Sequence, residues 1–131
     1  MISRRHFSLA AGAAALSCFN SSYAQSGSRI VLGQSAAFTG PAAQLGIQFH
    51  AGAKLWFDQV NDSGGVNGKF VEIKKMDDGY EPERCLANTK SLIDSGVFAL
   101  FGYIGTPTCL AALPVIKSSQ IPFIAPFTGA M

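Results

Sequence analysis

Charged side chains are scarce in this 131-residue chain, and the residue types that catalysis needs are scarcer. Only 14% of the residues are charged, and there are two histidines, three cysteines and one tryptophan. His6 lies near the N-terminus, and His50 has no second ligand at metal-binding spacing. The sequence also lacks a G-x-S-x-G elbow, a P-loop and a G-x-G-x-x-G fingerprint. We therefore expect no enzyme activity, no metal site and no cofactor.

The charge balance excludes a nucleic-acid partner. The formal net charge is +2, from ten basic and eight acidic side chains. Arg4 and Arg5 belong to an N-terminal segment that is typical of a removable export signal. Without that pair the charges cancel, and no basic patch remains to bind phosphates.

Residues 1–24 have the pattern of a signal peptide. The arginine pair is followed by an apolar section over residues 7–19, which is too short to span a bilayer. Small residues at Ser22 and Ala24 predict cleavage after Ala24. The pair followed by Phe7 and Leu9 favours the twin-arginine route, with a chance pair in a general secretory signal as the alternative. Either route exports the mature chain, residues 25–131.

The mature chain alternates apolar runs with segments of helical periodicity. This alternation predicts an α/β fold, an open parallel sheet with helices on both faces and right-handed crossovers. No helix follows the fourth strand, so we expect the fold to be incomplete at the C-terminus. The expected strands are residues 29–34, 69–76, 97–101 and 121–125, and the expected helices are residues 47–63, 81–95 and 109–119.

The first helix follows a loop of small residues, expected over residues 35–46. Its serine, threonine and glycine content suits contacts to a small polar ligand, although a plain surface loop has the same composition. The helix itself presents one broad apolar face, which we expect to pack on the sheet. That face consists of Ile47, Ala51, Leu55, Trp56 and Val60.

The most informative stretch is residues 100–108, where a buried strand meets the next helix. Gly102 and Gly105 allow a sharp turn, while Thr106 and Pro107 suit the first positions of a helix. A helix N-terminus carries partial positive charge and attracts carboxylates. Ligands of open α/β sheets bind at this end of the strands. An ordinary turn without a ligand is the alternative.

Two acidic residues close the second strand. Adjacent aspartates such as Asp77 and Asp78 can bind Mg²⁺ in a phospho-receiver domain. That fold also needs an aspartate after the third strand, where this chain has Tyr103 and Thr106. We therefore interpret the pair as solvated or as caps of the next turn.

Cys85 and Cys109 fall near the first turns of two helices that should lie side by side. An exported protein can oxidise such a pair to a disulfide. Two free, partly buried thiols fit the sequence equally well, because helix geometry must also bring the Cβ atoms together.

Several short motifs follow one another along the mature chain: residues 35–46 with Thr39-Gly40-Pro41, residues 64–68, Asp77-Asp78, residues 102–108 and residues 126–129. In this order they resemble one family, that of type I periplasmic solute-binding proteins, and within it the leucine/isoleucine/valine-binding proteins of ABC transporters. The resemblance covers residues 30–131. It implies two α/β lobes with the ligand between them, and makes residues 25–131 a partial N-terminal lobe.

The resemblance also implies a function and a site. The chain would be the substrate-binding component of an ABC transporter, capturing branched-chain amino acids or similar small carboxylates in the periplasm and delivering them to a membrane permease. An exported sensor with the same fold and an inactive truncated fragment are the alternatives. Thr106 takes the place of a hydroxyl residue that binds the ligand carboxylate. The other implied contacts are Ile104 and Gly105 lining the cleft, Phe127, Thr128 and Gly129 in a second segment, Leu45 as a pocket wall and Tyr103 as an aromatic wall.

The cysteines depart from the resembled pattern. Some members of the family have a disulfide between two positions that here hold Tyr80 and Gly105. A bridge between Cys85 and Cys109 would have a similar topology but would be a different bond.

Export gives a first testable prediction. Replacing Arg4 and Arg5 by lysine should block export, because the twin-arginine route requires arginine at both positions. Cell fractionation followed by N-terminal sequencing measures the outcome, and the exported wild type should begin at Gln25. Undiminished export of the lysine variant would indicate the general pathway, and a retained Met1 would contradict cleavage.

Overall fold

The computed structural model describes residues 29–129, so the predicted signal peptide, residues 1–24, lies outside the described residues. Four parallel strands form one sheet in the order β2-β1-β3-β4. The strands are β1 (Arg29–Ala36), β2 (Phe70–Asp77), β3 (Ala99–Phe101) and β4 (Phe123–Ile124). Helices α1 (Ala43–Asp62), α2 (Pro82–Asp94) and α3 (Thr106–Ser119) connect them. The predicted open parallel α/β sheet is confirmed.

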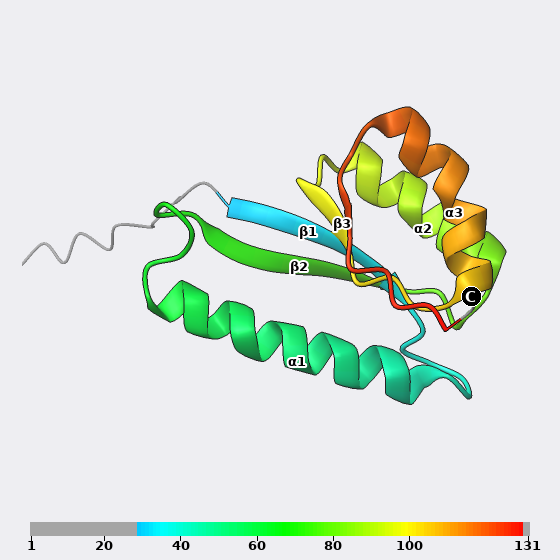
Figure 1. Ribbon diagram of the computed structural model, residues 1–131, viewed down its shortest axis with the longest axis horizontal. Coiled ribbons are helices and arrows are strands. Elements are labelled where there is room, and N and C mark those ends of the chain that lie inside the picture. Colours follow the sequence, from blue (N-terminus) through cyan, green and yellow to red (C-terminus); the bar gives the residue numbers. More distant parts are fainter. Residues whose placement is uncertain (1–28, 130–131) are drawn as a thin grey trace, which may run out of the picture.

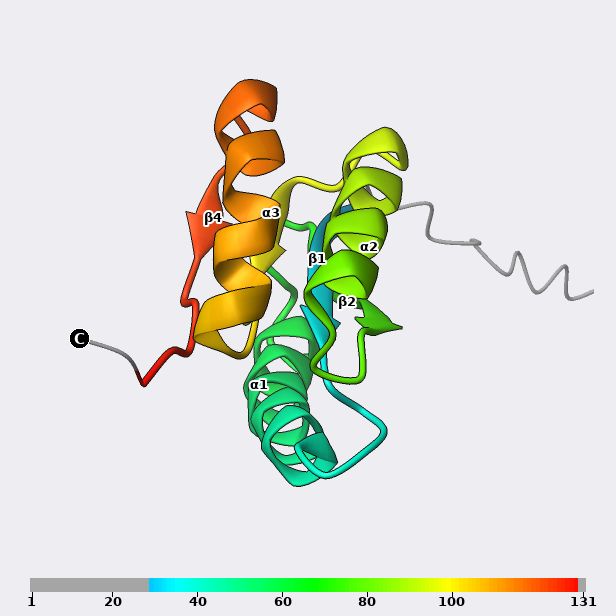
Figure 2. The ribbon, with the colours of Figure 1, turned by 90° about the vertical axis from the view of Figure 1, so that its right-hand side faces the viewer.

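Helices cover both faces of this sheet, as the alternating pattern predicted. In Figure 1, α1 runs along one face and α2 and α3 pack together on the other. Figure 2 shows α2 and α3 side by side, with α1 beneath the sheet. The larger buried cluster lies between the sheet and the α2–α3 pair, and includes Leu92, Leu100 and Ile116. None of the helices described between residues 29 and 129 is both long and apolar enough to cross a membrane.

The loop after β1 is shorter than expected. β1 continues to Ala36 and α1 begins at Ala43, because Ala43, Gln44 and Leu45 are good helix formers. Gly46 lets the first turn of α1 approach the end of β1, since a Cβ there would overlap the Ala37 carbonyl. This approach places the start of α1 at the carboxyl edge of the sheet.

Most of the predicted inner face of α1 is wrong. Leu55 and Trp56 are 75% and 62% exposed, and Ile47 and Ala51 are also exposed. Of the predicted residues only Val60 is half-buried, and it shares the face turned toward the sheet with Phe49, Ala53 and Phe57. α1 has apolar side chains on opposite sides, so periodicity alone did not select the face. Ring contacts decide it, with Phe101 lying 5.8 Å from Phe49 and 5.6 Å from Phe57 between ring centroids.

The two cysteines meet in the core as free thiols. Cys85 and Cys109 both belong to the cluster between the sheet and the α2–α3 pair, and no disulfide joins them in the structure. Of the two alternatives left open by the sequence, the structure therefore contains the free thiols. Burial raises the pKa of Cys85 to about 12 and also raises that of Cys109. Protonated, enclosed thiols react slowly.

The carboxylate of Asp77 ties together three separate segments at the carboxyl edge of the sheet. Its Oδ1 accepts hydrogen bonds from the backbone N–H groups of Phe38 at 2.7 Å, Thr39 at 3.1 Å and Gly79 at 3.1 Å. Its Oδ2 accepts from Thr39 Oγ1 at 2.7 Å and from the Arg84 guanidinium at 3.0 Å. One side chain thus fixes the loop after β1, the turn after β2 and the first turn of α2.

The neighbouring Asp78 is buried rather than solvated. Its Oδ1 accepts from the N–H of Tyr80 at 2.9 Å, which caps the turn as predicted. Its Oδ2 accepts from Ser35 Oγ at 2.8 Å. Burial raises the pKa of Asp78, and these hydrogen bonds offset the rise in part.

Because the two aspartates have different hydrogen-bond partners, replacing each by asparagine should have a different effect on the free energy of unfolding. Asp77→Asn turns an NH₂ group toward the Arg84 guanidinium, which has no acceptor, and should lower the free energy of unfolding by about 1.5–3 kcal/mol. Asp78→Asn is the matched control, because the Ser35 hydroxyl can accept as well as donate. We expect the control to cost less than about 1 kcal/mol in urea denaturation. A control as destabilising as Asp77→Asn would contradict this account.

The hydrogen bonds to Asp77 also predict that the stability of the fold depends on pH in the acidic range. Burial alone would raise its pKa, but hydrogen bonds from Thr39, Phe38, Gly79 and Arg84 outweigh that effect and hold the pKa well below its usual value of 3.8. Its contribution to stability is complete above that value and is lost as the pH falls toward the folded-state pKa. The difference in stability between wild type and Asp77→Asn should therefore shrink below about pH 4. A difference that stays constant down to pH ~2 would exclude this role.

Candidate functional site

Backbone hydrogen bonds join the loop after β3 to the segment after β4. We call residues 102–105 the β3–α3 loop. The N–H of Phe127 donates to the carbonyl of Tyr103 at 2.8 Å, and the N–H of Gly105 donates to the carbonyl of Phe127 at 3.0 Å. Ile104 and Phe127 form a parallel bridge. The structure thus brings together the two contact segments that the resemblance implied, at the carboxyl edge of the sheet.

The start of α3 is shaped by Gly105 and Thr108. Gly105 precedes the helix with φ of 104°, a conformation that favours glycine. The buried Thr108 donates its Oγ1 hydrogen toward the carbonyls of Ile104 at 2.6 Å and Gly105 at 2.9 Å. Thr106 is half-buried at the first helical position, and Pro107 has no N–H. Thr108 is fully buried, so the accessible donors of this turn are the N–H and the hydroxyl of Thr106.

Tyr80 packs directly over Gly105. A Cβ on Gly105 would overlap the Tyr80 ring, so the ring occupies the space that a larger residue would need. Tyr80 is 38% exposed and has φ of 70°, which is unusual for an aromatic residue. The two positions that hold a disulfide in some members of the resembled family are thus in contact here through a ring and a glycine.

Tyr103 does not form the aromatic wall that the resemblance implied. Its side chain is fully buried, with its hydroxyl 3.0 Å from Thr89 Oγ1 and its ring edge-on to Phe123 at 5.2 Å between centroids. Because Gly102 turns the backbone, Tyr103 points into the α2–α3 side of the core, where burial raises its pKa. The exposed aromatic residues at this edge are Tyr80 and Phe127 instead.

The remaining implied residues lie at the same edge. Thr128 and Gly129 are exposed beside Phe127, which is 53% exposed. Leu45 is half-exposed on the first turn of α1, on an element separate from the β3–α3 loop. One turn further, the Phe49 ring lies 6.3 Å from the Phe127 ring between centroids. α1 and the segment after β4 therefore meet through aromatic side chains.

Two hydrogen-bonded polar side chains, Gln34 and His50, lie behind the β3–α3 loop, and their pairing was not predicted from the sequence. Gln34 is fully buried on β1, where its Nε2 donates to the carbonyl of Gly102 at 3.1 Å. Its Oε1 lies 2.8 Å from His50 Nδ1. Burial lowers the pKa of His50, and the Lys75 and Lys54 ammonium groups lower it further. The signal for this pair was a glutamine at the end of an apolar strand, because a buried amide needs hydrogen-bond partners.

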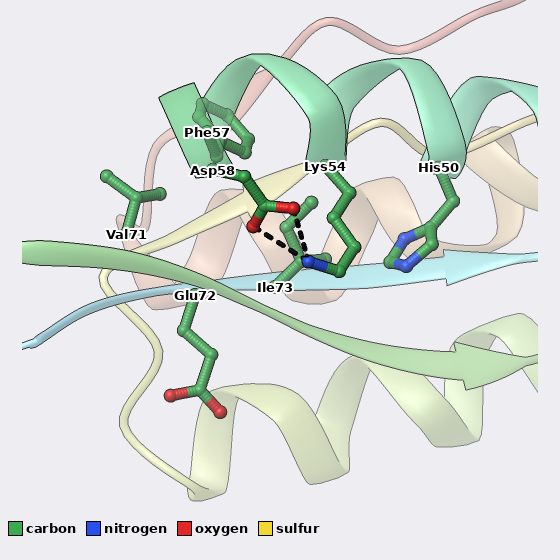
Figure 3. Close-up of a pocket in the computed structure, with 7 residues that line it drawn as sticks. All are labelled: His50, Lys54, Phe57, Asp58, Val71, Glu72 and Ile73. Carbon is green, nitrogen blue, oxygen red and sulfur yellow. Dashed lines mark hydrogen bonds and ion pairs between the residues drawn. The ribbon is translucent and has the colours of Figure 1, made fainter. Parts of the chain in front are cut away.

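A shallow pocket of about 220 Å³ lies elsewhere, between α1 and β2. Figure 3 shows its lining, with His50, Lys54, Phe57 and Asp58 from α1 facing residues of β2. Lys54 is paired with Asp58 at 2.6 Å, and Glu72 is paired with Arg29 at 2.8 Å. None of the expected ligand contacts lines this hollow, and its charges neutralise each other, so we place the candidate site at the carboxyl edge.

Comparisons with known proteins agree with this geometry. The family model described as periplasmic binding protein matches residues 29–130. The Leu/Ile/Val-binding protein of Citrobacter freundii is 30% identical over 122 residues, which cover 93% of this chain and 32% of the relative. This chain thus spans about a third of the length of that curated relative.

Two solved structures have the same fold over most of the chain. A "possible leucine/isoleucine/valine-binding protein" of Rhodopirellula baltica is 37% identical with a TM-score of 0.76, over 79% of this chain and 28% of that one. LivJ of Streptococcus pneumoniae, solved in complex with isoleucine, is 27% identical with a TM-score of 0.73, over 78% of this chain and 30% of that one. The chain belongs to the type I periplasmic binding proteins, in the leucine/isoleucine/valine-binding family.

Proposed function

We propose that this chain contributes one wall of a ligand site in an ABC transporter's substrate-binding component. The ligand would be a branched-chain amino acid or a similar small carboxylate, captured in the periplasm and passed to a membrane permease. Residues 1–24 would be the cleaved export signal and residues 25–131 part of the N-terminal lobe. This function requires binding and release rather than catalysis.

The observation that carries the proposal is the pairing of the β3–α3 loop with the segment after β4. Their backbone hydrogen bonds set the exposed Phe127–Gly129 segment beside the first turn of α3. The N–H and the hydroxyl of Thr106 in that turn suit a carboxylate, which gains from the positive end of the helix dipole. Gly105, Thr128 and the backbone of Ile104 complete the contacts we propose, with Leu45 as a wall on α1; the Ile104 side chain itself is 1% exposed and packs in the core.

The energetics predict weak binding by residues 25–131 alone. A charge-assisted hydrogen bond contributes about 1.5–3 kcal/mol, and less in a groove open to water. Association costs about 4 kcal/mol or more in lost freedom of motion. The balance corresponds to an affinity in the millimolar range. We expect NMR titration with leucine, isoleucine, phenylalanine and benzoate to shift the Thr106 and Thr128 amide signals only at millimolar ligand.

Thr106→Ala tests the proposed carboxylate contact. Losing one hydroxyl donor in a wet groove should weaken leucine binding about two- to tenfold. Thr106→Ser keeps the hydroxyl and is the matched control, for which we expect affinity within about twofold of the wild type. Equal affinity in all three proteins would remove Thr106 from the site. Signals that stay unshifted by every ligand would refute the proposed binding function itself.

A further inference from the structure

Gly102, the first residue of the β3–α3 loop, has both its N–H and its carbonyl group hydrogen-bonded. The N–H of Gly102 donates to the carbonyl of Ile124 at 3.0 Å, which continues the sheet pairing. The carbonyl of Gly102 accepts from Gln34 Nε2 at 3.1 Å, and this bond comes from a fully buried side chain rather than from the sheet. The direction in which the loop leaves the sheet therefore depends on a side-chain amide.

That amide has two orientations that differ by a half-turn, which exchanges its oxygen and nitrogen. With Nε2 toward Gly102, Oε1 faces His50 Nδ1 at 2.8 Å and can only accept, so Nδ1 carries the hydrogen. In the reversed orientation Oε1 would oppose the Gly102 carbonyl, and two acceptors repel. An Nδ1–H on His50 therefore stabilises one orientation of Gln34 alone.

Packing leaves no room for a side chain at position 102. Its φ is 63°, and a Cβ there would overlap the Phe49 ring and crowd Gln34 Nε2. Phe49 and His50 are consecutive residues of α1, so one helix turn supplies both the steric limit and the hydrogen-bond donor.

We propose that Gln34 and His50 are positioning residues of the β3–α3 loop. His50 Nδ1–H fixes the Gln34 amide, and Gln34 Nε2 then fixes the Gly102 carbonyl, which sets the course of Ile104, Gly105 and Thr106. Neither side chain is among the ligand contacts that we propose. This inference rests on the proposed function, because it concerns the loop that we assign to ligand binding.

The tautomer of His50 is the direct test and needs no ligand. Nitrogen-15 NMR of the imidazole in residues 25–131, recorded at neutral pH, should show Nδ1 protonated and Nε2 unprotonated. A protonated Nε2 with a bare Nδ1 would overturn the proposal, because such an imidazole cannot donate to Gln34.

Variants of His50 separate positioning from simple packing. His50→Leu fills similar volume without a donor, whereas His50→Asn places an amide N–H near the position of Nδ1. We expect the Gly105 amide to exchange with solvent about two- to tenfold faster in the leucine variant, and the asparagine variant to restore protection. Lys54→Met, one turn along α1, is the control and should leave this exchange unchanged.

Leucine affinity should follow the same pattern, falling about two- to tenfold in His50→Leu and recovering in His50→Asn. Unchanged Gly105 exchange in the leucine variant would refute positioning even if the tautomer is as expected. Wild-type protein that binds no ligand would count against the proposed function alone, since tautomer and exchange still decide the roles of Gln34 and His50.

Discussion

Five hydrogen bonds converge on the carboxylate of Asp77, and the arrangement of the carboxyl edge depends on them. Asp77 anchors the loop after β1 and the turn after β2 to one point. The turn that it fixes carries Tyr80, which in turn packs on Gly105. The Asp77 carboxylate at the end of β2 therefore influences the β3–α3 loop indirectly, because it fixes the turn that carries Tyr80 and Tyr80 packs on Gly105.

The layered arrangement of sheet and helices could be predicted from the sequence, because it follows from the spacing of apolar residues and from the order of strands and helices along the chain. Strands, helices and parallel pairing follow from apolar runs separated by helical segments. The inner face of α1 was not predictable in this way. Leu55 and Trp56 are as apolar as Phe49 and Phe57, and only the aromatic contacts with Phe101 distinguish the two sides.

The candidate site was predictable in its location but not in its details. Glycines, threonines and a proline after an apolar strand indicate a turn into a helix, and this is where the structure has one. The direction of each side chain depends on backbone angles that the sequence does not specify. Gly102, with φ of 63°, turns the backbone so that the Tyr103 side chain points into the core. The family resemblance had implied that Tyr103 lines the site, and this prediction is wrong. Gln34 and His50 are 16 residues apart, and their contact exists only in the folded chain.

The contact between Tyr80 and Gly105 has a consequence for how such chains diverge. A ring over a glycine leaves no room for a side chain at position 105, and a glycine without that ring leaves a hollow beside α3. The family resemblance implies a covalent bond between these positions in some members, whereas in this chain they are held together by packing. Any side chain at position 105 therefore requires a smaller residue than tyrosine at position 80, so substitutions at the two positions depend on each other.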